Sequence, residues 1–81
     1  MPLTRDPLFF PTADYCAKRA SITLFAIKRK FNIGHARAAT LIEQLKSACV
    51  IGEFRAQWYN FPVLADKKFI DDLKAAAEEL P

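Results

Sequence analysis

The chain contains one histidine, two cysteines and two glycines among its 81 residues. The single histidine has no second ligand at i+4, which excludes the helical ligand pair typical of zinc sites. The sequence also has no Ser/His/Asp set, no carboxylates clustered in an apolar pattern and no glycine-rich phosphate loop. These absences predict a protein that is not an enzyme and that holds neither a metal nor a cofactor.

The two cysteines, Cys16 and Cys49, form no CxxC pair. Both stand at apolar positions of predicted helices, so we expect two buried, reduced thiols. Long apolar runs are absent as well. None approaches the roughly 20 residues that a membrane span needs, and residues 1–6 lack the apolar centre of a signal peptide. The sequence therefore predicts a cytoplasmic protein without membrane contact.

Length and composition are typical of a small folded protein. Hydrophobic residues make up 52% of the chain, so we expect residues 1–81 to form one domain with a small core. The positive charge is concentrated: residues 18–37 contain six Lys and Arg residues and no acid, whereas residues 66–81 contain five acids and three lysines. Such a cluster of cations fits a phosphate backbone, and it is equally typical of a solvated helix face.

Residues 31–45 predict a turn that leads into a helix. Asn32 and Gly34 are turn residues that tolerate a positive φ. From residue 35 onward, apolar side chains follow helical spacing, and the opposite arc is polar, with small side chains near its start. The apolar arc comprises Ala38, Leu41, Ile42, Leu45 and Cys49, and the polar arc comprises Ala36, Thr40, Glu43 and Ser47. We expect this helix to span residues 35–48.

Two shorter helices are expected before this turn. Residues 11–18 form the first, with Pro11 in the first turn, where a missing N–H costs nothing. Residues 24–31 form the second. Residues 21–24 alternate polar and apolar side chains as a strand does, although Thr23 can instead cap the second helix. A short helix, a tight turn and a second amphipathic helix form the helix-turn-helix pattern, whose second helix can lie in a DNA major groove.

A hairpin and a further helix are expected after it. Residues 50–55 and 58–64 predict two strands. Pro62 cannot donate to a ladder, so its strand should lie at an edge or pair on one side only. Residues 66–80 predict a C-terminal helix capped by Asp66. Its apolar stripe comprises Phe69, Ile70, Leu73, Ala76, Ala77 and Leu80. The expected fold is mainly α with a small β-hairpin (α+β): a winged helix-turn-helix with an extra C-terminal helix.

Residues 7–64 resemble the C-terminal gamma domain of FtsK- and SpoIIIE-type DNA translocases. Residues 7–9 read P-L-F where the family has P-L-Y, and residues 28–31 supply the basic stretch and Phe that end the second helix. Residues 33–39 read I-G-H-A-R-A-A against the family's I-G-Y-N-R-A-A, and residues 41–45 read L-I-E-Q-L against I-I-E-Q-M. The resemblance implies a bacterial winged helix that binds double-stranded DNA with some sequence preference. It would orient a translocase, or serve as a plasmid- or phage-borne regulator in chromosome or plasmid partition.

The sequence departs from the family at three places. The family's Tyr-Asn pair reads His35-Ala36, and Ala36 has no side chain that can hydrogen-bond a base. A second family Arg reads Thr40. The family's wing is rich in Gly, Asn and Arg, whereas this one holds Arg55 among aromatic residues. The 81 residues contain no P-loop and no motor domain.

Arg37 matches the family's Arg and is the leading candidate for a base contact, because its guanidinium can pair bidentately with guanine or reach a phosphate. The alternative is a surface arginine paired with a nearby acid. Thr40 and Gln44 can contact a thymine methyl or an adenine edge, and His35 can contact a phosphate or cap the helix. The candidate DNA-binding residues are Lys28, Arg29, Lys30, His35, Ala36, Arg37, Thr40, Gln44 and Arg55.

The sequence also allows a different class of function. The chain can be a protein-interaction winged helix with little DNA affinity that self-associates through residues 66–80 or through the aromatic wing. The position of the Trp58 and Tyr59 side chains bears on self-association through the wing. We expect them to pack at the base of the wing, and the alternative is an exposed patch for a partner.

Overall fold

The computed structural model describes residues 7–79, except the side chains of residues 77–79. It is mostly helical with a small antiparallel sheet, which confirms the predicted fold class. The elements are α1 (Phe9–Ala17), β1 (Ser21–Ile22), α2 (Leu24–Phe31), α3 (His35–Ser47), β2 (Phe61–Pro62) and α4 (Lys67–Glu79). Leu80, which the sequence assigns to the last helix, lies outside the described residues.

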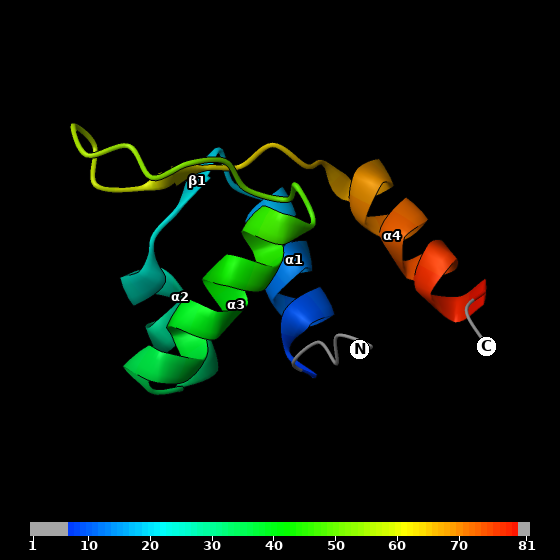
Figure 1. Cartoon of the computed structure of the whole chain (residues 1–81), viewed down its shortest axis with the longest axis horizontal. Helices are drawn as coiled ribbons and strands as arrows, with labels where there is room; N and C mark the ends of the chain where they lie inside the picture. The colour runs from blue at the N-terminus through cyan, green and yellow to red at the C-terminus, as the bar shows by residue number, and fades with distance from the viewer. Residues whose placement is uncertain (1–6, 80–81) are drawn as a thin grey trace.

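Helices α1, α2 and α3 form a body in which α3 packs against both α1 and α2. Residues 50–64, here called the wing, extend from one end of this body, and α4 lies on the opposite side of it (Figure 1). The result is elongated, with extents of 41 × 25 × 22 Å. This arrangement leaves the surfaces of α2, α3 and the wing free of α4.

Helix α1 begins two residues earlier than the sequence predicts. Phe9 starts it, and the Thr12 N–H donates to the Leu8 carbonyl at 2.9 Å, which closes the first turn. Pro11 occupies this first turn, where its missing N–H leaves no partner unsatisfied. Burial of Phe9 explains the early start, because the helix carries this ring into the core.

Helix α2 has the bounds that the sequence predicts, and its ends show why. The Thr23 hydroxyl accepts a hydrogen bond from the Ala26 N–H at 3.0 Å, a typical N-cap. Because Thr23 caps the helix, the preceding strand ends at Ile22 instead of extending to Leu24. Asn32 ends the helix with a left-handed φ of 52°, as expected for a turn asparagine.

Helix α3 buries the face that its sequence pattern predicts: Ala38, Leu41, Ile42 and Leu45 are buried. Gly34 precedes it as the N-cap residue with φ −77°, so the turn does not use the positive φ that a glycine tolerates. A Cβ added at Gly34 would meet no atom within 4 Å. The start of α3 is therefore open to solvent, and the fold itself does not need a glycine there.

Cys49 is exposed, which corrects the prediction of a second buried thiol. Helix α3 ends at Ser47, and Cys49 takes a left-handed φ of 63° that turns its side chain away from the buried arc. The Cys49 N–H donates to Lys46 O at 3.0 Å and the Val50 N–H donates to Leu45 O at 2.9 Å. This is the Schellman pattern of helix ends, which usually has a glycine at the left-handed position.

The two thiols should therefore react very differently. Burial raises the pKa of Cys16 to about 12, and its thiol is inaccessible, whereas Cys49 is exposed. Because the thiolate is the reactive form, we expect iodoacetamide to add once to the native protein, at Cys49, and twice in denaturant. Intact-mass spectrometry with peptide mapping measures this. Rapid native labelling of Cys16 would contradict the buried position.

Thr12 lies inside the core among apolar side chains, and its hydroxyl has no hydrogen-bond partner. An unpaired buried hydroxyl costs about 1–3 kcal/mol of desolvation. We therefore expect Thr12→Val, which keeps the shape and removes the hydroxyl, to raise the free energy of unfolding by about 1 kcal/mol. Urea denaturation measures it. Thr12→Ser is the matched control: it keeps the hydroxyl, loses a methyl and should lower stability. A less stable Thr12→Val protein would show that the hydroxyl is satisfied.

Strand β2 lies between β1 and residues 51–55. It pairs antiparallel with β1, with Pro62 opposite Ser21. On its other side the Pro62 carbonyl accepts a hydrogen bond from the Gly52 N–H at 2.9 Å. In an antiparallel pair the N and O of one residue face the same neighbour, so the Pro62 nitrogen, which has no hydrogen, also faces Gly52.

This position of Pro62 explains two differences from the predicted hairpin. The pairing between residues 51–55 and 60–63 is reduced to isolated bridges, Ile51 with Val63 and Arg55 with Asn60. Residues 50–55 therefore do not form a regular strand. The Pro62 strand belongs to a two-stranded sheet and has a regular ladder on one side only, as the sequence predicts.

Helix α4 packs on α1 of its own chain. Asp66 caps it as predicted, with the Phe69 N–H donating to the Asp66 carboxylate at 2.9 Å. Ile70 is buried and Leu73 half-buried, but Phe69 and Ala76 are exposed, so the inward stripe is narrower than predicted. The side chain of Ala77 lies outside the described part of the chain.

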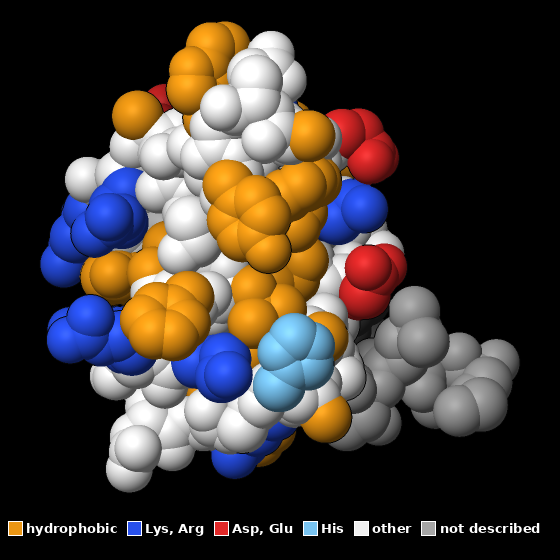
Figure 2. Space-filling view, turned by 90° about the vertical axis from the view of Figure 1, so that its left-hand side faces the viewer, with side chains coloured by type: hydrophobic (Ala, Val, Ile, Leu, Met, Phe, Trp, Pro, Cys, Tyr) orange, Lys and Arg blue, Asp and Glu red, His pale blue; other side chains and the backbone are white. Residues whose placement is uncertain are grey.

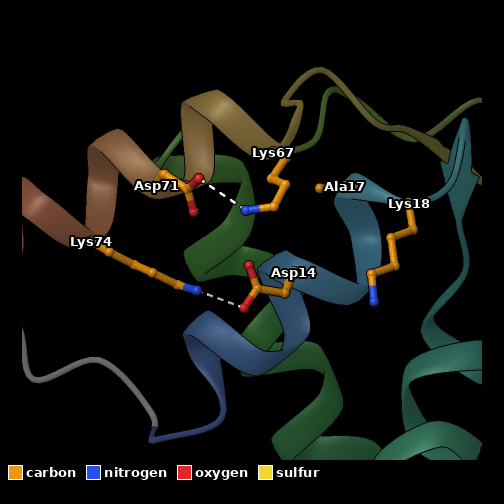
Figure 3. Close-up of a pocket in the computed structure, with 6 residues that line it drawn as sticks. All are labelled: Asp14, Ala17, Lys18, Lys67, Asp71 and Lys74. Carbon is orange, nitrogen blue, oxygen red and sulfur yellow. Dashed lines mark hydrogen bonds and ion pairs between the residues drawn. The ribbon is translucent and has the colours of Figure 1, made fainter.

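One ion pair spans the cleft between α1 and α4, and a second lies within α4 beside it. Lys74 Nζ lies 2.7 Å from the Asp14 carboxylate and Lys67 Nζ lies 3.1 Å from Asp71, around a cavity of about 270 Å³ (Figure 3). The hydrogen bond from Lys74 to Asp14 raises the pKa of the Lys74 ammonium above its ordinary value. The pair between Lys74 and Asp14 therefore joins α4 to α1 across this cleft.

Candidate nucleic-acid interface

The first two turns of α3 present the predicted contact residues to solvent. His35, Ala36, Arg37 and Thr40 are all exposed, and Gln44, one turn further on, is half-buried. Alanine at position 36 and the open space around Gly34 keep this surface shallow. The element that could have covered it, α4, packs on α1. The start of α3 is therefore exposed to solvent and not covered by α4.

Thr40 presents its methyl group more readily than its hydroxyl. The hydroxyl donates to the Ala36 carbonyl of the preceding turn at 3.1 Å. The donor is thus used within the helix, while the exposed side chain still offers a methyl group and an acceptor oxygen. This geometry suits an apolar contact with a thymine methyl.

The three consecutive cations of α2 point in different directions. Lys28 lies beside His35 in the lining of a groove next to the start of α3. Arg29 lies over the Phe25 ring, with its Cζ 5.9 Å from the ring centroid. Lys30 lies over the Tyr15 ring of α1, with Nζ 5.5 Å from the centroid. The structure therefore brings Lys28 to the α3 surface and places Lys30 in a separate group on α1.

Arg55 has a structural role within the wing. Its Nε and Nη2 donate to Asn60 Oδ1 at 3.1 and 2.9 Å, across the bridge that closes the wing turn. Its guanidinium also lies 4.9 Å from the Trp58 ring centroid. The DNA contact that the sequence assigns to Arg55 stays a prediction, and the structure shows that this side chain already ties the wing together.

The wing exposes its aromatic residues. Trp58 is 61% exposed and Tyr59 is 77% exposed, so the expectation that they pack at the base of the wing is wrong. Phe54 lies below them in edge-to-face contact with Tyr59, at a centroid distance of 5.3 Å, and with Phe61, at 5.2 Å. Hydrophobicity in the sequence indicates burial but cannot show that no element covers the wing; that information lies in the placement of α4.

A groove of about 440 Å³ runs between α2, the start of α3 and the wing. Figure 2 shows this face of the molecule, with apolar side chains interleaved with Lys and Arg and the single His beside them. Among the residues that the structure describes, no acidic one lines the groove. Its lining residues are Thr23, Leu24, Phe25, Lys28, His35, Phe54, Tyr59 and Phe61. The groove is the surface that sequence analysis missed, although its aromatic and basic residue types could have suggested it.

Among residues 7–79 there is no group of three His, Cys, Asp or Glu side chains arranged to hold a metal ion. Within that same range, no helix is both long enough and apolar enough to cross a bilayer.

A helix-turn-helix followed by a hairpin that pairs back onto β1 defines a winged-helix-like α+β fold. The chain belongs to the FtsK gamma domain family, whose model matches residues 4–58. This match confirms the family resemblance read from the sequence. The DNA translocase FtsK of Chlamydia pneumoniae is 40% identical over 48 residues, which cover 59% of this chain and 6% of that protein. The chain therefore corresponds to a small part of the translocase.

Proposed function

We propose that this chain binds double-stranded DNA, with a preference for sequence, through the start of α3. The observation that carries the proposal is the exposed surface formed by His35, Ala36, Arg37 and Thr40, with Lys28 beside it. Membership of the FtsK gamma domain family supports it, because the similar Chlamydia pneumoniae protein is a DNA translocase. The α3 surface would enter a major groove, as the second helix of a helix-turn-helix does.

The residues divide into two roles under this proposal. Arg37 and Thr40 read base edges, Arg37 through a bidentate guanine pair and Thr40 through its methyl group. Lys28, Arg29 and His35 position the domain on phosphates, which adds affinity without sequence information. The role is binding and not catalysis. It suits a domain that orients a translocase on DNA or a plasmid- or phage-borne regulator, and it fits a cytoplasmic location.

Two matched variants test the placement of the DNA. Lys28→Gln and Lys30→Gln remove the same charge from the same helix, but only Lys28 lies next to α3. Each lost phosphate contact lowers the slope of log K against log salt by about 0.9. We expect Lys28→Gln to weaken duplex binding and to lower the slope by about 1, with Lys30→Gln close to the parent. Fluorescence anisotropy of a labelled duplex across a salt series measures this.

Two outcomes of that series would reject the proposal. Duplex binding that is weak and independent of salt would show that DNA is not the ligand. Equal losses in Lys28→Gln and Lys30→Gln would show that net charge, and not the α3 surface, drives binding.

A second candidate function is self-association, which the exposure of Trp58 and Tyr59 favours. Self-association through α4 has less exposed apolar surface available than the sequence suggests, because Ile70 is buried and Leu73 half-buried within the same chain. Light scattering over a concentration series distinguishes the routes: Tyr59→Ala should reduce a concentration-dependent mass if the wing associates, and Phe69→Ala should reduce it if α4 does.

A further inference from the structure

The groove beside α3 is lined by flat apolar rings that the rest of the fold leaves exposed. Phe25 is 62% exposed at one wall, and Tyr59, Phe54 and Phe61 form the other. Its volume of about 440 Å³ lies within the range of ligand pockets, roughly 300–1,000 Å³. Exposed rings that border a groove can stack with another flat ring that enters it.

Among the described residues, the charged side chains that line the groove are cationic, and acidic side chains lie farther out on the same face (Figure 2). Lys28 and His35 line the groove, and the Arg29 guanidinium covers Phe25 at 5.9 Å. Outside the groove, Arg55 lies 4.9 Å from the Trp58 ring on the same wing. A ring next to a cation, repeated along a surface, matches the alternation of base and phosphate in a nucleic-acid strand. The absence of acids from the lining makes an anionic ligand the complementary one.

We propose that this groove binds an unstacked base of single-stranded DNA, next to the surface at the start of α3. The base stacks on the exposed rings, and its flanking phosphates meet Lys28 and Arg29. Proteins that engage unstacked DNA use such aromatic side chains, and stacking tolerates every base because each has a π-face. The inference deepens the proposed DNA-binding function and rests on it for the shared cationic face.

The test compares two ligands that differ only in their bases. A labelled thymidine oligonucleotide of about 12 nucleotides is compared with an abasic strand of equal length and charge, by anisotropy at fixed salt. We expect the parent protein to bind the strand with bases about 5- to 150-fold more tightly, the effect of one stacked base. Equal binding of the two strands would overturn the proposal and leave the groove to an acidic protein partner.

Variants of the groove residues then show where on the protein the bases bind. Phe25→Ala and Tyr59→Ala, both at exposed positions, should each remove most of the difference between the two strands. Phe69→Ala, an exposed ring on α4, is the matched control and should keep it. If both groove variants keep the difference, bases bind elsewhere and the proposal is wrong.

Arg37→Ala separates this proposal from the proposed function. It should lower duplex sequence preference and leave the advantage of bases over abasic strand intact. A parent that shows the base advantage but no salt-dependent duplex binding would reject the α3 proposal alone. The reverse result would reject only the groove.

Discussion

Replacing Arg37 by alanine is expected to lower the preference for the best-bound duplex over random duplex by about 5- to 150-fold. Arg37 is exposed in the first turn of α3, beside Ala36, which cannot compensate with a hydrogen bond of its own. A bidentate arginine–guanine pair contributes about 1–3 kcal/mol of discrimination. The best duplex is first selected from random sequences with the parent protein, and anisotropy then compares it with a scrambled duplex.

Two control variants separate base reading from charge. Arg37→Lys keeps the charge but loses the planar fork, so we expect it to keep affinity for random duplex and to lose preference. Lys46→Ala removes one positive charge at the other end of α3, where the lysine lies 3.6 Å from Glu53, and should keep the preference. If Arg37→Ala retains the parent's preference, Arg37 does not read a base.

Leu45→Ala is expected to unfold a large fraction of the molecules. Leu45 is fully buried on the inner face of α3, and leucine-to-alanine changes in cores cost about 2–5 kcal/mol. An 81-residue chain has a small core, and small domains are stable by only about 5 kcal/mol or somewhat more. The loss is therefore comparable to the whole stability. Urea denaturation followed by circular dichroism measures it.

Leu64→Ala provides the comparison for this change, because Leu64 is exposed on the wing. It should alter the free energy of unfolding by less than about 0.5 kcal/mol. A Leu45→Ala protein as stable as Leu64→Ala would mean that α3 does not pack through this face.

Sequence reasoning succeeded where local chemistry decides the structure. The bounds of α2 follow from the Thr23 cap and the left-handed Asn32, and the start of α4 follows from the Asp66 cap. The buried face of α3 follows from helical spacing between Ala38 and Leu45. Each of these features depends on residues within a few positions of one another.

Sequence reasoning failed where contacts between residues far apart in the chain determine the structure. Cys49 continues an apolar spacing, but the helix ends before it and the chain reverses there. Phe69 continues the stripe of α4, but α1 covers only part of that helix. Exposure of Trp58 and Tyr59 depends on where α4 lies, which no local pattern records. The candidate DNA-contact residues follow from the family motif, and the groove beside them follows only from the three-dimensional placement of the wing.

Pro62 also has a mechanical consequence. The outgoing arm of the wing, residues 60–64, contains β2, which pairs with β1. The incoming arm, residues 51–55, is joined to the outgoing arm only by isolated bridges and single backbone hydrogen bonds. The closed end of the wing therefore depends on a side chain as well as on backbone pairing, since Arg55 Nε and Nη2 both donate to Asn60 Oδ1 across the turn. With an interrupted ladder behind it, this charged pair of hydrogen bonds carries a larger share of the closure than it would in a regular hairpin.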